Sequence, residues 1–570
     1  MKKYLCLFLF LGLLFLGCSD DHEEKRQPTG DLIKLSIIPT ISTNYEAGIQ
    51  YLGVITDLPW RASSSADWLS VSSASGTGSS KVGVSWKENK TLEDRQAKVV
   101  FSVNGMETTL TVTQGHKVEA SHIVSFRPIL GNQARNEVDS VEVIFNKPTK
   151  VIGHTPPGGN GRMFDEGLRW QLPIGKWGLG DDVEVRMSFK PLNDSIVSRD
   201  TITVPFYEKK FLLTEPDDAI RNSALSLDKK SIWVAVTNKL ADKNKVMQIS
   251  LDDMTVIKSV KMPFDPQFLC VNPYNGLLYV LPYNGNFSTS AKDNFSGLGY
   301  LDYSNTGHSH YFCVVDPEQG KILKTIDIEP SLTAHPQYPE IYPDEIAFTK
   351  DGFGILRLVS VSATGLEWRY IDSADGDKIT LSGYDWSEHE FERLYPNYDY
   401  SRIYANPYPR QSTSLEWVNR QHPVPTVITL HNKFNSDEYY AGGYLAYLSM
   451  SPFANKAFIC TNPACQVVVG LDGAVTYSKV IIEETRGSMN VWDELVQDKD
   501  YVYKIHNMGA FLELLDMTKS EVVFASSHHI GDWNQLMNCH FLPTTDQLVL
   551  TEVQGIWIYN AAAIKNEVKR

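Results

Sequence analysis

The chain has 570 residues, of which 42% are hydrophobic, and its formal net charge at pH 7 is −15. This length exceeds what one hydrophobic core supports, so we expect three or four domains. Lys and Arg are scattered singly. Because no basic stripe is present to neutralise phosphates, the composition argues against a nucleic-acid partner, and it offers no polybasic patch for anionic lipid.

The first residues have the features of an export signal. Lys2 and Lys3 precede an apolar run from Tyr4 to Leu16, which Gly17 and Cys18 follow. A positive start, a hydrophobic segment of about a dozen residues and a small residue before the cut are typical of secretory signals. The segment is too short to form a stable membrane span.

This arrangement resembles the lipobox of bacterial lipoproteins. The resemblance implies that residues 1–17 are a lipoprotein signal peptide and that lipid on Cys18 is the only attachment to the membrane; the alternative is a signal peptide that merely contains a cysteine. Residues 18–30 are similar to the acidic tether that sends lipoproteins of Bacteroidetes-type bacteria to the cell exterior. A plain solvated linker is the other interpretation of this segment. We therefore expect an outer-membrane location, facing outwards.

Residues 31–117 alternate between short strand-like runs and turn-rich stretches, which predicts a small β-sandwich. The stretch 72–80, which contains Gly76 and Gly78, is expected to be rich in turns. The expected strands are 32–37, 51–56, 81–86, 98–103 and 108–113.

The same segment resembles a BACON domain, a module often found at the N-terminus of glycan-processing proteins. The resemblance is carried by Trp60, the run Ser63 to Val71, the turn Ser75 to Gly78 and the closing strand Leu110 to Gln114. It implies either a spacer or a sugar binder. In the second case Trp60, Trp68 and Trp86 would offer flat faces to sugar rings, although tryptophan in a sandwich is more often core.

Residues 118–209 predict a second sandwich, of Ig-like type. Its expected strands are 123–127, 140–145, 168–172, 183–189 and 200–206.

From residue 210 to residue 568 the chain repeats. Apart from one longer interval, strand-like cores recur about 45 to 55 residues apart, which is the spacing of four-stranded propeller blades. The seven cores are 232–236, 277–281, 354–358, 402–405, 456–460, 501–505 and 547–551.

Three of the repeats continue into a hairpin with an Asp-led turn, at 246–260, 312–326 and 511–525. These hairpins resemble those of YVTN-type or quinoprotein-like seven-bladed β-propellers. The segment 210–214 is expected to add a strand to the last blade and close the ring. The predicted fold class is therefore all-β: two N-terminal Ig-like β-sandwiches followed by a seven-bladed propeller.

Aromatic residues concentrate in the longest insertion, at 282–311, and again at 384–408. Asn, Gly and Ser mixed with aromatics suit loops that stack on a sugar ring and hydrogen-bond its hydroxyls, although a disordered surface excursion is the alternative for the insertion. The candidate ligand-binding residues are Tyr283, Phe295, Tyr300, Tyr303, His308, His310, Trp386, Tyr395 and Tyr398.

The sequence has few motifs that indicate a metal site, a cofactor site or a disulfide. No spacing of Cys and His fixes a metal site, and no cofactor motif is present, so we expect neither metal nor cofactor. Asp372, Asp375 and Asp377 around a glycine favour a hairpin turn over a calcium loop. Cys460 and Cys465 flank a predicted four-residue hairpin loop, 461–464, and are candidates for a disulfide.

Three functions remain open. The first is a non-catalytic surface lipoprotein that binds a polysaccharide or glycoconjugate through the propeller loops, with the sandwiches as spacers. The second is a propeller lyase or glycoside hydrolase, whose catalytic residues the sequence does not identify. For a hydrolase, carboxylates such as Asp344 and Glu345 would have to pair across a substrate. The third is a scaffold that docks an outer-membrane protein.

Overall fold

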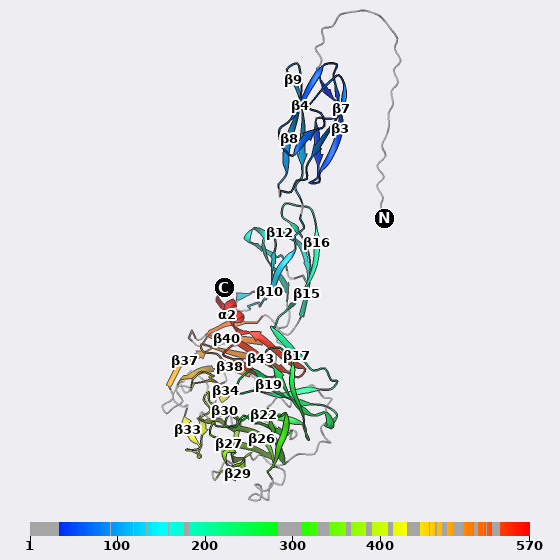
Figure 1. Ribbon diagram of the computed structural model, residues 1–570. Helices are drawn as coiled ribbons and strands as arrows, with labels where there is room; N and C mark the ends of the chain where they lie inside the picture. Colours follow the sequence, from blue (N-terminus) through cyan, green and yellow to red (C-terminus); the bar gives the residue numbers. More distant parts are fainter. Residues whose placement is uncertain are drawn as a thin grey trace, which may run out of the picture. The chain divides into compact units, whose positions relative to one another are not determined.

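The computed structural model describes residues 33–569 with internal gaps (Figure 1). The gaps are 92, 118, 133–134, 158, 176–181, 283–309, 329–340, 361–365, 383–389, 409–413, 430–444, 455, 462–463, 470–475, 483–493, 507–510, 517, 520 and 527–535. The described part is nearly all β, and α2 (Ala561–Lys569) is its one α-helix. The predicted lipidation residue Cys18 and the acidic tether precede the described residues. The chain divides into two compact units, 1–120 and 121–570.

Two sheets enclose the core of the first unit. One sheet has the strand order β1 (Lys34–Leu35), β3 (Gly48–Ile55), β7 (Ser80–Trp86), β5 (Leu69–Val71). The other has the order β2 (Thr40–Thr43), β9 (Met106–Gln114), β8 (Arg95–Val103), β4 (Pro59–Ser64), β6 (Ser75–Thr77). Alternate residues of β8 are buried, as a strand with one face on a core requires. The all-β prediction is confirmed for this unit.

The turn predicted at 75–78, within the turn-rich stretch 72–80, was wrong, because β6 occupies 75–77 and pairs with β4. A Cβ added at Gly76 of β6 would lie 2.5 Å from the Trp60 ring. A glycine that reads as turn in the sequence therefore lets the backbone of a short strand approach a buried tryptophan.

The second unit begins with two further sheets, which we call the two-sheet segment (121–208). Their strand orders are β10 (Ile123–Ile129), β11 (Asp139–Phe145), β14 (Arg169–Gly175), β13 (Arg162–Phe164), and β12 (Thr149–Thr155), β15 (Asp182–Pro191), β16 (Ser198–Pro205). Buried residues of both sheets form one core, including Val143, Leu172, Val185 and Val204.

Seven four-stranded antiparallel sheets make up the rest of the described second unit. In order from the first to the fourth strand, sheet 1 is β18 (Ala219–Leu225), β19 (Ser231–Thr237), β20 (Lys245–Ser250), β21 (Val256–Lys261), and sheet 2 is β22 (Pro266–Val271), β23 (Leu278–Pro282), β24 (Tyr311–Asp316), β25 (Lys321–Asp327). Sheet 3 is β26 (Ile341–Phe348), β27 (Phe353–Ser360), β28 (Leu366–Asp372), β29 (Lys378–Leu381), and sheet 4 is β30 (Glu390–Pro396), β31 (Ile403–Tyr408), β32 (Ser414–Val418), β33 (Thr426–Thr429).

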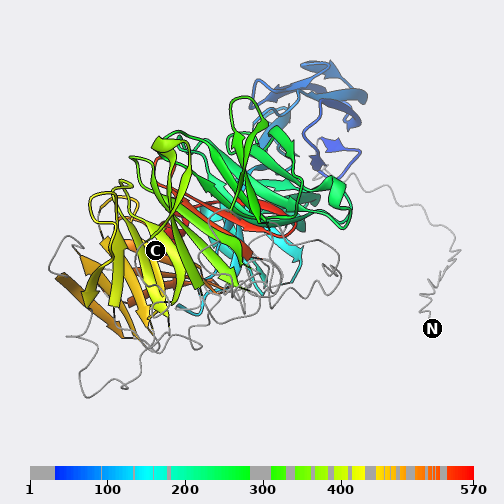
Figure 2. The same cartoon turned by 90° about the horizontal axis from the view of Figure 1, so that it is seen from below.

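The last three sheets follow the same pattern. Sheet 5 is β34 (Leu445–Met450), β35 (Lys456–Thr461), β36 (Ala464–Val469), β37 (Thr476–Ile482), and sheet 6 is β38 (Glu494–Gln497), β39 (Tyr501–His506), β40 (Phe511–Asp516), β41 (Glu521–Ala525). Sheet 7 is β42 (Leu536–Leu542), β43 (Gln547–Glu552), β44 (Gly555–Asn560), β17 (Lys209–Leu212). In Figure 2 the colours pass from green through yellow to orange across neighbouring sheets, in chain order.

The series of sheets closes on itself. The first strand of each sheet contacts the first strand of the next, and β42 of sheet 7 contacts β18 of sheet 1. One core joins Ile220 and Val234 of sheet 1 to Val549 and Ile556 of sheet 7. The arrangement is propeller-like, and we call these sheets the ring.

The strand at the start of the ring pairs with the end of the chain. Lys209–Leu212 of β17 run antiparallel to Gly555–Ile558 of β44. The prediction that 210–214 adds a strand to the last sheet is confirmed for residues 210–212. The pairing joins residues 209–212 and 555–558, which are far apart in sequence, in one sheet.

The seven strand cores predicted from the sequence coincide with the second strands β19, β23, β27, β31, β35, β39 and β43. Every residue of β19 is buried. The three predicted hairpins are the third and fourth strands of sheets 1, 2 and 6.

The two-sheet segment contacts the ring through polar and apolar groups. Asn132 Nδ2 donates to Val523 O at 3.4 Å, and Arg135 Nη1 donates to Glu567 O of α2 at 2.6 Å. Leu130 packs against the core of sheets 6 and 7. Among the helices that the structure describes, none is long and apolar enough to cross a membrane.

Candidate functional site

The strands of the ring alternate in direction, so their connections fall at two ends. Turns after first and third strands lie at one end, which we call the short-connection end. Connections after second and fourth strands lie at the other, the long-connection end. The longest connections, 283–310, 328–340, 430–444 and 483–493, all belong to the long-connection end.

Turns at the short-connection end are compact and hold themselves by local hydrogen bonds. Asp316 Oδ1 accepts from the backbone N–H groups of Glu318 and Gln319 at 2.8 and 3.0 Å, and Asp516 does the same for Thr518 at 2.8 Å. Aspartate at the first turn position favours this geometry.

Helix α2 also packs at the short-connection end. Lys565 Nζ lies 2.6 Å from Asp498 Oδ2 of sheet 6 and 2.6 Å from Asp546 Oδ1 of sheet 7. Helix α2 therefore covers part of the short-connection end.

First strands carry a repeated irregularity near the long-connection end. In six of them the pairing with the second strand shifts register within the first residues. Such bulges re-aim a side chain. The residues set out of register include Arg221, Gln267, Asp344 and Arg393.

A buried polar network fixes the long-connection end at sheets 1 and 2. Asn238 Nδ2 donates to Asp218 Oδ1 at 2.7 Å, and Lys245 Nζ lies 2.6 Å from Asp218 Oδ2. Asn244 Nδ2 donates to Asp265. Burial raises the pKa of the Asp265 carboxyl, which the Asn244 bond and the charge of Arg221 partly oppose. The Asn244–Asp265 bond links sheet 1 to the segment that leads into sheet 2.

Two described aromatic rings stack at the long-connection end. The rings of His310, next to β24, and Tyr342, near the start of β26, lie with centroids 4.9 Å apart and 29° between their planes. The stack joins sheets 2 and 3 beside the ends of the two connections 283–310 and 328–340. Tyr342 itself is buried.

The predicted ligand-binding residues fall into three groups. Six lie outside the described residues: Tyr283, Phe295, Tyr300, Tyr303, His308 and Trp386. His310 lies at the long-connection end. Tyr395 and Tyr398 lie at or next to the turn after β30, at the short-connection end, where Tyr398 is 46% exposed. The structure thus separates His310 from Tyr395 and Tyr398.

The paired carboxylates Asp344 and Glu345 are both held by one buried arginine. Arg357 Nη2 is hydrogen-bonded to Asp344 and lies 3.3 Å from Glu345 Oε2, while Glu345 Oε1 accepts from Leu394 N at 3.0 Å. Burial raises the pKa of Glu345, and the charge of Arg357 opposes that rise. The ion pairs of Arg357 lie within sheet 3, and the Glu345–Leu394 hydrogen bond links that sheet to sheet 4.

The Asp-rich turn forms an ordinary connection, as predicted. Asp372 accepts from Ala374 N at 3.0 Å, and Asp377 Oδ1 accepts from Tyr279 Oη at 2.5 Å. Across the described part of the chain, no group of three or more His, Cys, Asp or Glu is placed to hold a metal ion.

Cys460 and Cys465 are directly opposite each other in the pairing of β35 with β36. The connection between these strands is two residues shorter than the predicted 461–464 loop, because both Thr461 and Ala464 belong to strands. A disulfide between the two cysteines stays a prediction.

The tryptophans of the first unit are largely unavailable to sugar. Trp60 and Trp86 are 2% and 9% exposed and donate their Nε1–H to backbone carbonyls, of Gly78 and Glu46 respectively. The guanidinium of Arg95 lies over the Trp68 ring at 4.3 Å. These contacts favour a core role over a sugar-binding face.

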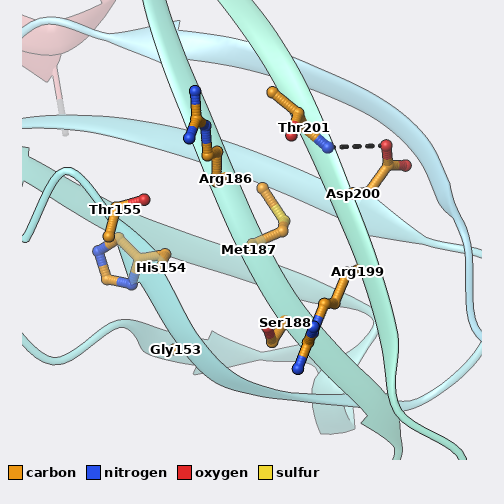
Figure 3. A pocket seen from close by; sticks show the side chains of 9 residues that line it. All are labelled: Gly153, His154, Thr155, Arg186, Met187, Ser188, Arg199, Asp200 and Thr201. Atoms are coloured by element: carbon orange, nitrogen blue, oxygen red, sulfur yellow. Dashed lines mark hydrogen bonds between the residues drawn. The ribbon is translucent and has the colours of Figure 1, made fainter.

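A well-described pocket lies on the outer face of the three-stranded sheet in the two-sheet segment (Figure 3). Its volume is about 690 Å³. Sequence reasoning missed it, because its residues come from three strands with no shared motif. The outward-facing residues that line it are Gly153, Thr155, Arg186, Ser188, Arg199 and Thr201.

Comparisons with known proteins bear on the first unit. Residues 58–115 match the BACON family model. That model is described as "Putative binding domain, N-terminal". The match covers a small part of the chain and agrees with the resemblance seen in the sequence. No curated protein matches the chain.

Solved structures are similar to parts of the chain. A Bacteroides ovatus GH5 xyloglucanase in complex with a XXXG heptasaccharide is 22% identical over 15% of this chain, with a TM-score of 0.14; the match spans 19% of the xyloglucanase. A functionally unknown protein from Desulfotomaculum acetoxidans is 12% identical, covering 64% of this chain and 96% of its own, with a TM-score of 0.38. The Dos1 propeller is 10% identical, covering 77% and 92%, with a TM-score of 0.38.

Proposed function

We propose that the chain is a non-catalytic surface lipoprotein that binds a polysaccharide or glycoconjugate. Lipid on Cys18 anchors it in the outer membrane, and 18–30 is the tether to the exterior. The first unit and the two-sheet segment are Ig-like sandwich spacers. The ring is a seven-bladed propeller whose long-connection end takes the glycan.

The asymmetry of the ring carries this proposal. Its longest connections leave from one end only, and ligand sites are commonly built on such connections over a rigid scaffold. The polar network around Asp218 and the His310–Tyr342 stack supply that scaffold. The opposite end has compact turns and is partly covered by α2.

The nature of the longest connection favours glycan as the ligand. Between Pro282 and Tyr311 the sequence mixes Asn, Gly and Ser with aromatics. Aromatic rings stack on sugars while amides and hydroxyls bond to their hydroxyl groups.

A panel experiment tests binding against catalysis. Protein starting at Gln27 is run in gels that contain host or plant polysaccharides, while the same mixtures are assayed for released products. Retardation without product supports the proposal. Released product would replace it with the lyase or hydrolase, and neither signal would direct the search to a protein partner.

The anchor is tested separately in cells. Cys18→Ser should abolish incorporation of labelled fatty acid and release the protein from the membrane fraction. Cys6→Ser, within the signal segment, is the matched control and should be labelled normally. Labelling of Cys18→Ser would contradict the proposed anchor.

A further inference from the structure

The pocket of the two-sheet segment has a polar outward wall built by strand alternation. Val185, Met187 and Phe189 of β15 are buried, so Arg186 and Ser188 between them face outwards. Arg186 is opposite Thr155 and Thr201 on the flanking strands, and Ser188 is opposite Gly153 and Arg199. Residues opposite each other share a face, so these six side-chain positions form one surface.

No Trp, Tyr or Phe is among the residues that line this pocket. Its outward-facing polar groups are the hydroxyls of Ser188, Thr155 and Thr201 and two guanidinium groups, and Asp200 and His154 also line it. The pocket therefore lacks a platform for stacking on neutral sugar rings, and it suits a ligand held by hydrogen bonds and negative charge.

The two arginines lie toward opposite ends of the pocket (Figure 3). The side chain of Arg199 forms no hydrogen bond or ion pair with any residue that the structure describes. Arg186 Nε donates to Glu184 Oε1 at 2.7 Å, which steadies its guanidinium. Guanidinium groups bind carboxylate and sulfate-like oxyanions through paired N–H donors.

Three further residues that line the pocket, Asp200, Met187 and His154, alternate with the six outward-facing positions along their strands. Asp200 Oδ1 accepts from Thr201 N at 2.8 Å, Met187 is buried, and His154 Nε2 is hydrogen-bonded to Pro173 O of the other sheet at 2.8 Å. A Cβ added at Gly153 would meet nothing within 4 Å, so the floor there is open.

We propose that this pocket binds an acidic oligosaccharide segment, through two anionic groups that meet Arg186 and Arg199 and sugar hydroxyls that meet Ser188 and Thr201. The volume of about 690 Å³ accommodates more than one sugar ring. The anionic groups are carboxylates or sulfates. This site is separate from the long-connection end of the ring and does not depend on the function proposed for it.

Affinity electrophoresis of protein starting at Gln27 tests the site with three probes: polygalacturonate, dextran sulfate and neutral dextran. Arg199→Gln should weaken binding to an acidic probe about tenfold or more, as expected for a lost hydrogen bond to a charged group. The double variant Arg186→Gln/Arg199→Gln should abolish it. Added salt should weaken binding of the parent to the acidic probes, because it screens the attraction between their charges and the arginines.

Two further variants keep the result interpretable. Gly153→Val adds a side chain to the open floor and should also weaken binding, with no change in charge. Arg61→Gln removes an exposed arginine of the first unit and should bind like the parent. Unfolding temperatures of all variants, compared with the parent, show whether each is folded.

Binding to polygalacturonate alone would identify carboxylates as the anionic groups that the pocket recognises. Binding to dextran sulfate alone would identify sulfates, and binding to both would mean that the pocket recognises either oxyanion. The proposal is overturned if neither acidic probe binds at low salt, or if the folded double variant binds as the parent does. It is also overturned if Arg61→Gln causes an equal loss. Variants of the long-connection end leave this pocket intact, so the two sites can fail independently.

Discussion

Trp60 shows how single residues stabilise the first unit. Its ring fills the core next to Gly76, and its Nε1–H is satisfied by Gly78 O at 3.1 Å. A side chain at position 76 would collide with the ring, since the ideal Cβ lies only 2.5 Å from it. Packing against the Trp60 ring therefore requires glycine at position 76.

We predict that Gly76→Ala destabilises the first unit by about 1–3 kcal/mol, the usual cost of overpacking a core. Chemical unfolding of protein starting at Gln27, followed by tryptophan fluorescence, measures this. Gln50→Ala, at an exposed position of β3, is the control and should change little. Equal stability of Gly76→Ala and the parent would contradict the described packing.

Arg420 connects neighbouring sheets through a two-point contact. Its Nη1 and Nη2 lie 2.6 and 2.9 Å from the two carboxylate oxygens of Asp372. The Arg420 bonds lower the pKa of Asp372 from its ordinary value of 3.8. Because the folded pKa is lowered, the stabilisation is present above the unfolded value and is lost as the pH falls through the folded one.

Arg420→Gln should therefore reduce stability near neutral pH by about 0.5–1 kcal/mol, since the pair is about one-third exposed and solvent screens it. The difference from the parent should shrink once the pH is below 3.8. Unfolding curves at several pH values measure this, with Lys261→Gln, at an exposed position of β21, as the control for loss of a surface charge. A difference that stays constant with pH would rule out the ion pair as its cause.

At the scale of elements, β17 links the start of the ring to the end of the chain. It supplies the fourth strand of sheet 7, although it precedes the first strand of sheet 1 in the chain. Gly555 of β44 allows this approach, because a Cβ there would lie 2.2 Å from Phe211 O.

We predict that Gly555→Val opens the β17–β44 pair and increases amide hydrogen exchange in both strands. Exchange measured by mass spectrometry on peptides covering 209–212 and 555–558 tests this. Gly153→Val, where there is open space, should leave these peptides protected. Unchanged protection in Gly555→Val would contradict the described pairing.

The second strand of each sheet was the most predictable element. Buried on both faces, these strands have continuous apolar runs such as Ile232–Val236, which stand out in the sequence. First strands were not predicted, because their bulges break the alternation of apolar and polar residues. The short strands β4 and β6 were not predicted, because they contain serine or glycine, and these residues favour turns.

At the scale of the whole molecule, contacts between distant segments could not be predicted. Arg135 meets α2, and Asn132 meets β41, with no periodicity to signal either. The outward pocket around Arg186 and Arg199 likewise required the registers of three strands. Candidate ligand residues could be chosen by composition, but not assigned to an end of the ring, which is why His310 and Tyr398 were grouped.

Arg135→Ala should loosen the two-sheet segment from the ring, because it removes donors to the carbonyls of Glu567 and Val568. Limited proteolysis should then cut more rapidly near 205–208, where the segment joins β17. Arg162→Ala removes an exposed arginine on the same segment and is expected to leave the cleavage rate unchanged. Equal rates for Arg135→Ala and the parent would show that this contact contributes little.

The central claim is that the ring binds glycan at its long-connection end. The most direct measurement compares gel retardation of the parent, Tyr300→Ala/Trp386→Ala and Tyr398→Ala on a polysaccharide that the panel identifies. We predict that the double variant loses retardation and that Tyr398→Ala, at the short-connection end, keeps it. Full retardation of the folded double variant, or loss on Tyr398→Ala alone, would contradict the account.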